Sequence, residues 1–499
     1  MEKGLSELFE TFRKEASMSR FSAAFSEEGK VLSVGDGIVQ ISGLRDAKLY
    51  ELIRMENGDE GIVFDLYRET IGVVLLTQRS NIRAGEAAFK TDLIASIVTG
   101  SGLLGRVVDA LGSPIDGGSP IEDGVPYPVE RKAPSLIQRD FVTTPLYTGI
   151  KVIDSMLAIG RGQRELIIGD SSTGKSSIAI DTIINQKNSD VISIYAAIGQ
   201  KASSVLKITE EVKKYGDISK TVFVVADASD PVGQQYIAPY SATAIAEFFL
   251  EHGKDVLIIY DDLTKHAKAY RSLSLLLRRP PGREAYPGDI FYIHSRLLER
   301  SAKLHQKYGG GSITALPIVE TQQGRISSYI PTNLISITDG QIYLDSGLFN
   351  KGIRPAVDVG KSVSRIGGKA QIGAMKVVAE RLKIDYSRFT EVEVFTRFGA
   401  HVEEETAKLI RRGERMREIL KQPRFRPFSV IEEFLSLLVL ETGVLDELEL
   451  DSVTALTVRI TEDIIGAFQE IIDRISTEGE ISPKELGSLR EFIHAQKPS

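Results

Sequence analysis

The feature that most constrains the fold is the octapeptide Gly169-Asp-Ser-Ser-Thr-Gly-Lys-Ser176, which follows an apolar run (165–168) and precedes a helix-like stretch (177–186). It matches G-x-x-x-x-G-K-[ST], a loop whose backbone N–H groups and following helix N-terminus face anionic phosphates. We expect Lys175 to contact the β- and γ-phosphates and the Ser176 hydroxyl to ligate Mg²⁺. The flanking strand and helix disfavour the alternative, a glycine-rich turn with an incidental lysine. The sequence therefore predicts a phosphate-binding loop (P-loop) in an α/β domain.

Two further polar residues follow predicted strands. The apolar run 256–260 ends in Asp261 and Asp262, where a carboxylate that holds magnesium belongs in P-loop proteins. A strand-end aspartate alone is as often a turn residue, but the upstream P-loop favours Asp261 as the metal-side acid. Gln200 follows the run that begins at Tyr195. A hydrolytic enzyme needs, at this position, a group that orients or deprotonates the attacking water. A neutral amide cannot accept the proton, although glutamine orients water in some GTPases. The residues alone leave open an exposed loop glutamine.

Hydrophobic patterning divides the 499 residues into three regions. From about residue 30 to 91, short β-rich runs broken by turns, over 31–34, 37–41, 61–64 and 70–76, predict a small closed or sandwiched β domain. From about 94 to 370, continuous apolar runs alternate with helix-like stretches and predict a parallel sheet covered on both faces. Beyond about 372 the apolar spacing is helical, over 403–420, 430–440 and 460–475. We expect four segments: an amphipathic N-terminal helix (1–22), a β-barrel (23–93), an α/β P-loop domain (94–371) and an α-helical domain (372–499).

Composition excludes several classes of protein. With 61 Lys and Arg against 68 Asp and Glu, the net charge is −7, which argues against a dedicated nucleic-acid binder. Cysteine is absent, so disulfides, thiol nucleophiles and Cys-ligated metals are excluded, and the six histidines show no metal-binding spacing. We predict neither a signal peptide nor a transmembrane helix, because no apolar run approaches the ~20 residues that span a bilayer.

An apolar stripe marks the N-terminal segment, where Leu5, Leu8, Phe9 and Phe12 share one helical face. Such a helix packs on its own domain or docks on a partner, and composition alone favours self-packing.

Long motifs in a fixed order give the chain a family resemblance. They are 105–116, 145–156, the P-loop, 260–265, 275–289, 336–342 and Arg354-Pro-Ala-Val-Asp-Val-Gly-Lys-Ser-Val-Ser-Arg365. With them the chain resembles, along almost its full length, the alpha subunits of F-type ATP synthases. These are the non-catalytic nucleotide-binding subunits of the F1 head, with a RecA-like central domain.

The resemblance implies roles for individual residues. Arg365 matches the family's arginine finger, which reaches the γ-phosphate in the neighbouring beta subunit, and Ser336 would lie near that interface. A guanidinium suits this role because it is always charged and forked, and such fingers are worth about 10³–10⁵ in kcat. Gln200 stands where beta has its catalytic glutamate, which implies a site that does not hydrolyse ATP. The residues expected at bound Mg-ATP or ADP are Gly169, Asp170, Ser171, Ser172, Thr173, Gly174, Lys175, Ser176, Ser177, Gln200, Arg354, Gln422 and Arg424, with Ser176 and Asp261 at Mg²⁺.

The resemblance also implies partners. The chain would alternate with beta in a hexameric ring, contact the gamma rotor, and meet the delta and b subunits of the peripheral stalk. Its N-terminal stripe would then dock on delta. The complex would lie at the cytoplasmic face of the cell membrane, touch it only through Fo, and couple ion flow to ATP synthesis or hydrolysis. The isolated chain is predicted not to turn over ATP.

Two other classes share this core. A homohexameric secretion or flagellar-export ATPase keeps a catalytic glutamate at the position of Gln200. A Rho-like helicase is disfavoured by the acidic charge and by the long helical C-terminal region.

The chain departs from the family pattern in three places, one of them a pair of residues. Ser171 and Ser172 replace the usual Arg-Gln pair of the P-loop, Arg424 replaces a glutamine near the adenine pocket, and Arg325 stands where aspartate is common. Loss of the P-loop arginine removes a phosphate-side contact. We therefore expect the nucleotide at this site to bind more weakly or to exchange more slowly. The same changes indicate a divergent or alternate ATP synthase.

Overall fold

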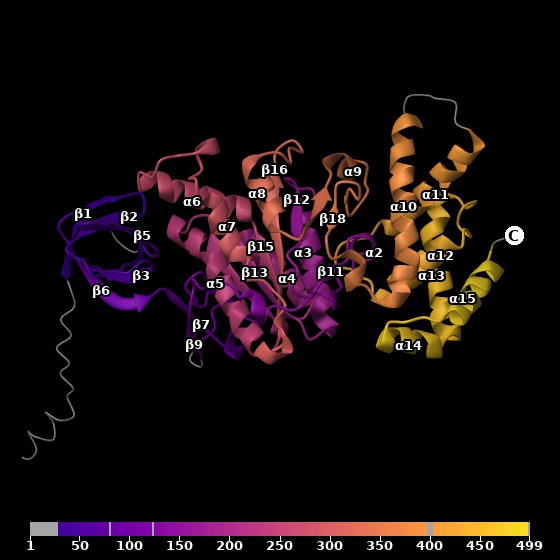
Figure 1. The fold of residues 1–499 in the computed structure, drawn as a ribbon, viewed down its shortest axis with the longest axis horizontal. Helices are drawn as coiled ribbons and strands as arrows, with labels where there is room; N and C mark the ends of the chain where they lie inside the picture. The colour runs from indigo at the N-terminus through magenta and orange to yellow at the C-terminus, as the bar shows by residue number, and fades with distance from the viewer. Residues whose placement is uncertain (1–27, 79–80, 122–123, 397–402, 498–499) are drawn as a thin grey trace, which may run out of the picture. The chain divides into compact units, whose positions relative to one another are not determined.

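The structure is a computed structural model that describes residues 28–78, 81–121, 124–396 and 403–497 (Figure 1). The predicted N-terminal helix, with its stripe from Leu5 to Phe12, lies outside the described residues. Among the residues that are described, no helix is both long and apolar enough to cross a membrane.

The N-terminal compact unit, which ends at Ile94, contains a closed antiparallel barrel of order β1-β2-β5-β4-β3-β6. Alternate residues point inward, and side chains such as Val39, Ile53 and Val73 have no exposed surface. Closure pairs both edge strands, as a small β domain requires. Four strands match predicted runs, whereas β3 and β6 were not predicted. The strands are β1 (Glu28–Gly35), β2 (Ile38–Ser42), β3 (Glu51–Met55), β4 (Glu60–Leu66), β5 (Thr70–Leu75) and β6 (Ala87–Ile94).

The second compact unit begins at Ala95 and contains an eight-stranded sheet of order β18-β17-β12-β16-β15-β13-β14-β8 (Figure 1). All neighbouring strands are parallel except β17 and β18. The central strands are almost wholly buried, as continuous apolar runs predict. The strands are β8 (Val107–Asp109), β12 (Leu166–Asp170), β13 (Ile192–Gln200), β14 (Thr221–Asp227), β15 (Asp255–Asp261), β16 (Ser312–Thr321), β17 (Gly340–Leu344) and β18 (Val363–Ser364).

Helices pack against this sheet in two groups. α3 and α4 contact each other and the strands β12–β16, whereas α5 and α6 contact each other and β13–β16. Short strand pairs, β7 (Ser96–Thr99) with β9 (Val125–Pro128) and β10 (Pro145–Leu146) with β11 (Ile159–Gly160), lie outside the sheet. The helices are α2 (Lys151–Met156), α3 (Lys175–Asn185), α4 (Ala202–Tyr215), α5 (Val232–Glu251), α6 (Leu263–Leu276), α7 (Ile290–Leu298), α8 (Tyr329–Ile337) and α9 (Ser346–Asn350).

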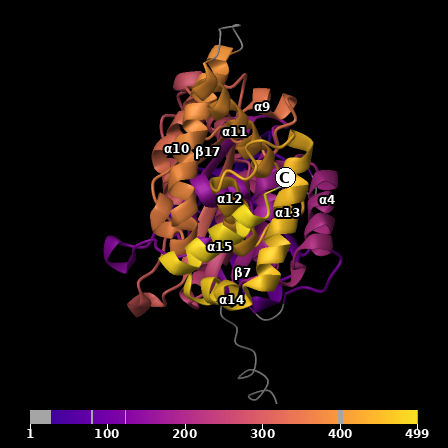
Figure 2. The ribbon, with the colours of Figure 1, turned by 90° about the vertical axis from the view of Figure 1, so that its right-hand side faces the viewer.

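The C-terminal region is helical, and α12 lies at its centre (Figure 2). One buried apolar cluster joins these helices to the α/β region, from Ile150 and Ile183 to Phe434 and Leu435. The helix predicted over 460–475 is divided at Phe468, and α10 and α15 were not predicted. The helices are α10 (Gly373–Thr396), α11 (Glu404–Leu420), α12 (Val430–Glu441), α13 (Leu450–Ala467), α14 (Gln469–Glu478) and α15 (Pro483–Ala495). The predicted fold class of β-barrel, α/β domain and helical domain is confirmed.

Candidate nucleotide-binding site

The P-loop leaves the carboxyl end of β12 and enters α3, as its sequence predicts. Gly169 is required by close approach, because a Cβ there would lie 2.7 Å from the Leu344 carbonyl oxygen. Gly174 takes φ +101°, a left-handed conformation that glycine adopts without strain. Because β12, β13, β15 and β16 are parallel, their carboxyl ends bring the P-loop and the strand-end side chains to one edge of the sheet.

Lys175 folds back over its own loop, where its Nζ donates a 2.6 Å hydrogen bond to the Asp170 carbonyl oxygen. Burial lowers the pKa of Lys175, while the charges of Glu320, Asp262 and Asp261 oppose this effect. The ammonium group is thus held at the loop by an uncharged acceptor, which a phosphate oxygen can replace.

Asp261 is the meeting point of the strand ends. Its Oδ2 accepts a 2.8 Å hydrogen bond from Ser176 Oγ, and its Oδ1 accepts one of 2.9 Å from Gln200 Nε2. The wholly buried Tyr195 hydroxyl also donates to Oδ2. The interpretation of Gln200 as an exposed loop residue is therefore wrong. Sequence reasoning missed Tyr195, whose only signal was a polar hydroxyl within a buried strand.

Asp262 caps the N-terminus of α6, where its side chain accepts a 2.7 Å hydrogen bond from the Lys265 backbone N–H. Burial, followed by the charge of Asp261, raises the pKa of Asp262 to about 6. The choice of Asp261 over Asp262 as the metal-side acid stays a prediction.

The Asp170 carboxylate supports the loop by bonding to neighbouring segments. Its carboxylate accepts hydrogen bonds from Thr321 Oγ1 (2.6 Å), the Gly324 backbone N–H (2.9 Å) and Ser346 Oγ (3.0 Å). These bonds tie the P-loop to the ends of β16 and β17. Ser171 and Ser172, next along the loop, are exposed, and Ser172 has φ 62°.

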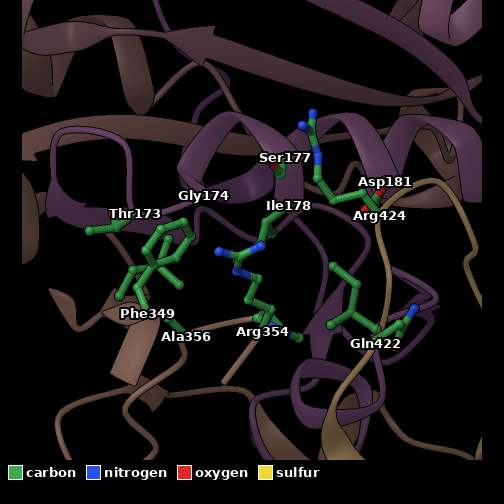
Figure 3. Close-up of a pocket in the computed structure, with 13 residues that line it drawn as sticks. Thr173, Gly174, Ser177, Ile178, Asp181, Phe349, Arg354, Ala356, Gln422 and Arg424 are labelled. Atoms are coloured by element: carbon green, nitrogen blue, oxygen red, sulfur yellow. The ribbon is translucent and has the colours of Figure 1, made fainter. Parts of the chain in front are cut away.

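A cavity opens beside the P-loop and α3 (Figure 3). Arg354 projects among its lining residues, and its guanidinium lies 4.6 Å from the ring centre of Phe349. The wall of the cavity is largely apolar, which suits a planar nucleotide base. The lining comprises Ile150, Thr173, Gly174, Ser177, Ile178, Asp181, Leu344, Phe349, Arg354, Pro355, Ala356, Gln422 and Arg424.

Gln422 lines this cavity, but its amide is already bonded. Nε2 donates to the Gly149 (2.7 Å) and Arg426 (3.0 Å) carbonyl oxygens, and Oε1 accepts from the Lys151 backbone N–H at 3.3 Å. Gln422 therefore shapes the cavity wall through its position, and its hydrogen bonds join the helical region to α2.

Arg424 extends away from Arg354 (Figure 3). Its Nη2 lies 3.8 Å from Glu211 Oε2, and its guanidinium lies 4.5 Å from the ring centre of Phe425. The Phe425 backbone N–H donates a 2.8 Å hydrogen bond to Asp181, whose pKa burial raises to about 6. Arg424 is thus paired with α4, and the neighbouring Phe425 is bonded to α3.

Arg365 and Ser336 do not line this cavity. Arg365 follows β18 at the sheet edge, where its backbone N–H donates to the Asp339 carbonyl oxygen at 2.9 Å and its side chain is exposed. Ser336 is exposed on α8, and its hydroxyl donates to the Asn333 carbonyl oxygen. Arg325 is exposed as well.

Magnesium fits the oxygen atoms at the P-loop. Ser176 and Asp261 place a hydroxyl and a carboxylate 2.8 Å apart, and these are donors that Mg²⁺ accepts together with phosphate oxygens. Within the described ranges, no group of three or more His, Asp or Glu side chains forms a site for a metal held by protein alone.

Comparison with known proteins identifies two regions of the chain. Residues 149–364 match the nucleotide-binding domain of the ATP synthase alpha/beta family, and residues 371–496 match the C-terminal domain of the alpha/beta chains.

Several curated proteins are similar over nearly their whole length. ATP synthase subunit alpha of Caldanaerobacter subterraneus subsp. tengcongensis is 51% identical over 95% of this chain and 94% of that protein. The subunits alpha of Dehalococcoides mccartyi (51%; 94% of this chain, 93% of that protein) and Petrotoga mobilis (49%; 95% and 94%) are comparable. The chain belongs to the ATP synthase alpha/beta family, among its alpha subunits.

Proposed function

We propose that this chain is the non-catalytic, nucleotide-binding subunit of the F1 head of a rotary ATP synthase. The observation that carries the proposal is the Gln200 amide, which donates to Asp261 beside the P-loop lysine. A group that donates a hydrogen bond to the metal-side carboxylate, and cannot accept a proton, holds a nucleotide without activating water. Because the relatives are alpha subunits over about 94% of this chain, the homohexameric export ATPase is the less supported alternative.

The ligand of the chain's own site is Mg-ATP or Mg-ADP. The P-loop N–H groups and Lys175 would hold the β- and γ-phosphates, and Ser176 with Asp261 would hold Mg²⁺. The adenine would enter the cavity lined by Phe349, Arg354 and Gln422. Mg²⁺ supplies charge neutralisation at the phosphates when it is bound.

Arg365 serves a second nucleotide, in the neighbouring beta subunit. Its exposed position at the edge of the sheet, outside the chain's own cavity, supports a role in trans, with Ser336 near the same interface. The further partners are gamma, delta and b, and the chain would be peripheral to the membrane as part of F1.

Nucleotide titration of the purified chain tests its own site. Mg-ATP should bind, raise the melting temperature and not turn over, whereas Lys175→Ala should lose the thermal shift. Because Ser171 and Ser172 replace Arg-Gln, the double change Ser171→Arg, Ser172→Gln should bind Mg-ATP more tightly. Robust ATPase activity of the chain alone would overturn the proposal, and tighter binding by wild type than by the double variant would overturn the effect of the two serines.

Reconstitution tests Arg365. Rings assembled with the chain's own beta and gamma subunits should hydrolyse ATP, and Arg365→Ala should lower kcat by about 10³-fold or more. Unchanged turnover would remove Arg365 from the mechanism.

A further inference from the structure

A buried carboxyl group with an incomplete set of hydrogen-bond partners lies immediately before the first residue of β12. Glu165 has no exposed surface, and only one of its oxygens is bonded: Oε2 accepts a 2.7 Å hydrogen bond from Gln163 Nε2. Oε1 is buried and accepts no hydrogen bond. An unsatisfied buried carboxyl oxygen is costly, so it calls for an explanation.

The carboxyl group lies against the strand pair that leads to Arg365. A Cβ on Gly340, in β17, would meet Glu165 Oε2 at 2.5 Å and Oε1 at 2.8 Å. Only glycine at this point lets the carboxyl group lie over β17. Gln163 Nε2 also donates to Ser364 Oγ at 3.2 Å, and Ser364 pairs with Gly340 across the two strands. A short hydrogen-bonded path therefore runs from Glu165 to the residue before Arg365.

The nearby charges single out Arg365 as the cation for this carboxyl group. Asp339 disfavours ionisation of Glu165 and Arg365 favours it, although burial dominates and holds the pKa of Glu165 well above its usual value. Arg164 is engaged elsewhere, because its Nε and Nη2 donate to Asp339 at 3.0 and 2.9 Å and its Nη1 to Glu299. The Arg365 side chain is exposed and makes no side-chain hydrogen bond within the described part of the chain.

We propose that Glu165 is a positioning residue for Arg365. Its Oε1 accepts a hydrogen bond from one edge of the guanidinium, and this bond directs the other edge toward the phosphate of the nucleotide bound in the neighbouring subunit. The inference rests on the proposed role of Arg365 in trans. A guanidinium has five N–H donors in a rigid fork, so it can bond a carboxylate on one side and a phosphoryl oxygen on the other. Fixing it before the reaction removes the cost of orienting it during the reaction.

The test uses rings assembled from this chain and its own beta and gamma subunits. Glu165→Gln keeps the volume, but its single oxygen is needed by Gln163, so an NH₂ group faces the guanidinium. We expect kcat for ATP hydrolysis to fall about tenfold, with KM for Mg-ATP within twofold of wild type. Inhibition by Mg-ADP with aluminium fluoride, a mimic of the transferring phosphoryl group, should weaken in parallel. The double variant Glu165→Gln, Arg365→Ala should be no slower than Arg365→Ala alone.

The matched control is Glu433→Gln, an equally buried carboxyl group on α12, which should leave kcat unchanged. The positioning role is wrong if Arg365→Ala abolishes turnover while Glu165→Gln keeps wild-type kcat. It is also wrong if the decreases in kcat of the two single variants multiply in the double variant. In either case the function of Arg365 stands. If Arg365→Ala leaves turnover intact, the proposed function of Arg365 fails first. Should Glu165→Gln not assemble, Gln163→Met breaks the bridge to Ser364 and must lower kcat for the inference to hold.

Discussion

Asp261 shows how single residues decide the chemistry of this site. Ser176, Tyr195 and Gln200 all donate to its carboxylate, so three hydrogen bonds fix the orientation of this acid. A carboxylate at position 200 would face a second carboxylate instead of donating to it.

Gln200→Glu is therefore expected to destabilise the chain in a pH-dependent way. The introduced carboxyl group lies beside Asp261, so its folded-state pKa should be raised, and the variant loses stability as pH rises through that value. We expect a loss of about 1–3 kcal/mol relative to wild type at pH 8, little loss at pH 5, and partial recovery with Mg²⁺. Urea unfolding at both pH values measures this, with Gln40→Glu on the exposed face of β2 as the control. Equal loss at both pH values would contradict the explanation.

At the scale of elements, two helix glycines should respond oppositely to the same change. A Cβ on Gly413, in α11, would lie 2.0 Å from the ring of Phe389 on α10, whereas Gly487, in α15, has open space around it. Gly413→Ala should destabilise by about 1–3 kcal/mol through overpacking. Gly487→Ala should stabilise by up to about 1 kcal/mol through helix propensity. Urea unfolding of both variants measures the difference, and a stabilising Gly413→Ala would disprove the close helix contact.

The contact between α2 and α12 buries two carboxyl groups, Asp154 and Glu433. Burial raises the pKa of Asp154 to about 6, and burial with the charge of Asp154 holds the pKa of Glu433 well above its usual value. Lys151 lies nearby, and burial lowers its pKa to about 8. Both carboxyl groups thus have folded-state pKa values above the unfolded ones.

This pair stabilises the fold at low pH, and that stability is lost as pH rises through the folded-state values. Glu433→Gln removes one ionisation, so its melting temperature should exceed that of wild type at pH 8 and match it at pH 5. Thermal unfolding over pH 5–8 measures the difference. A constant offset between the two proteins would show that the ionisation of Glu433 does not contribute.

At the scale of the whole molecule, the two compact units have separate cores. The barrel core lies within residues 31–88, whereas one continuous core joins the nucleotide-binding and helical regions. Calorimetry should therefore show two unfolding transitions, and Mg-ATP should raise only the one that belongs to the second unit. A third transition, with the helical region melting alone, would contradict the shared core.

Much of the architecture was predictable because it follows from local patterns. Four barrel strands and the central strands follow from the periodicity of apolar residues. The P-loop helix follows from the eight contiguous residues of the motif at 169–176. β3, β6 and α10 were missed because mixed polar and apolar sequences are decided by packing; Arg54 and Glu60, for example, form an ion pair across β3 and β4. α13 and α14 share one helical pattern, and only the structure divides them at Phe468.

Local sequence alone establishes a P-loop motif over residues 169–176, the domain order β, α/β and α, and an amide at position 200. These are properties of contiguous residues or of their periodicity, which need no knowledge of the fold. Three features follow only from the folded chain: Gln200 and Tyr195 bond Asp261, the Gln422 amide bonds backbone groups, and Glu165 lies over Gly340. The physical reason is that such contacts join residues up to 273 positions apart, and sheet order and strand register set which of them meet.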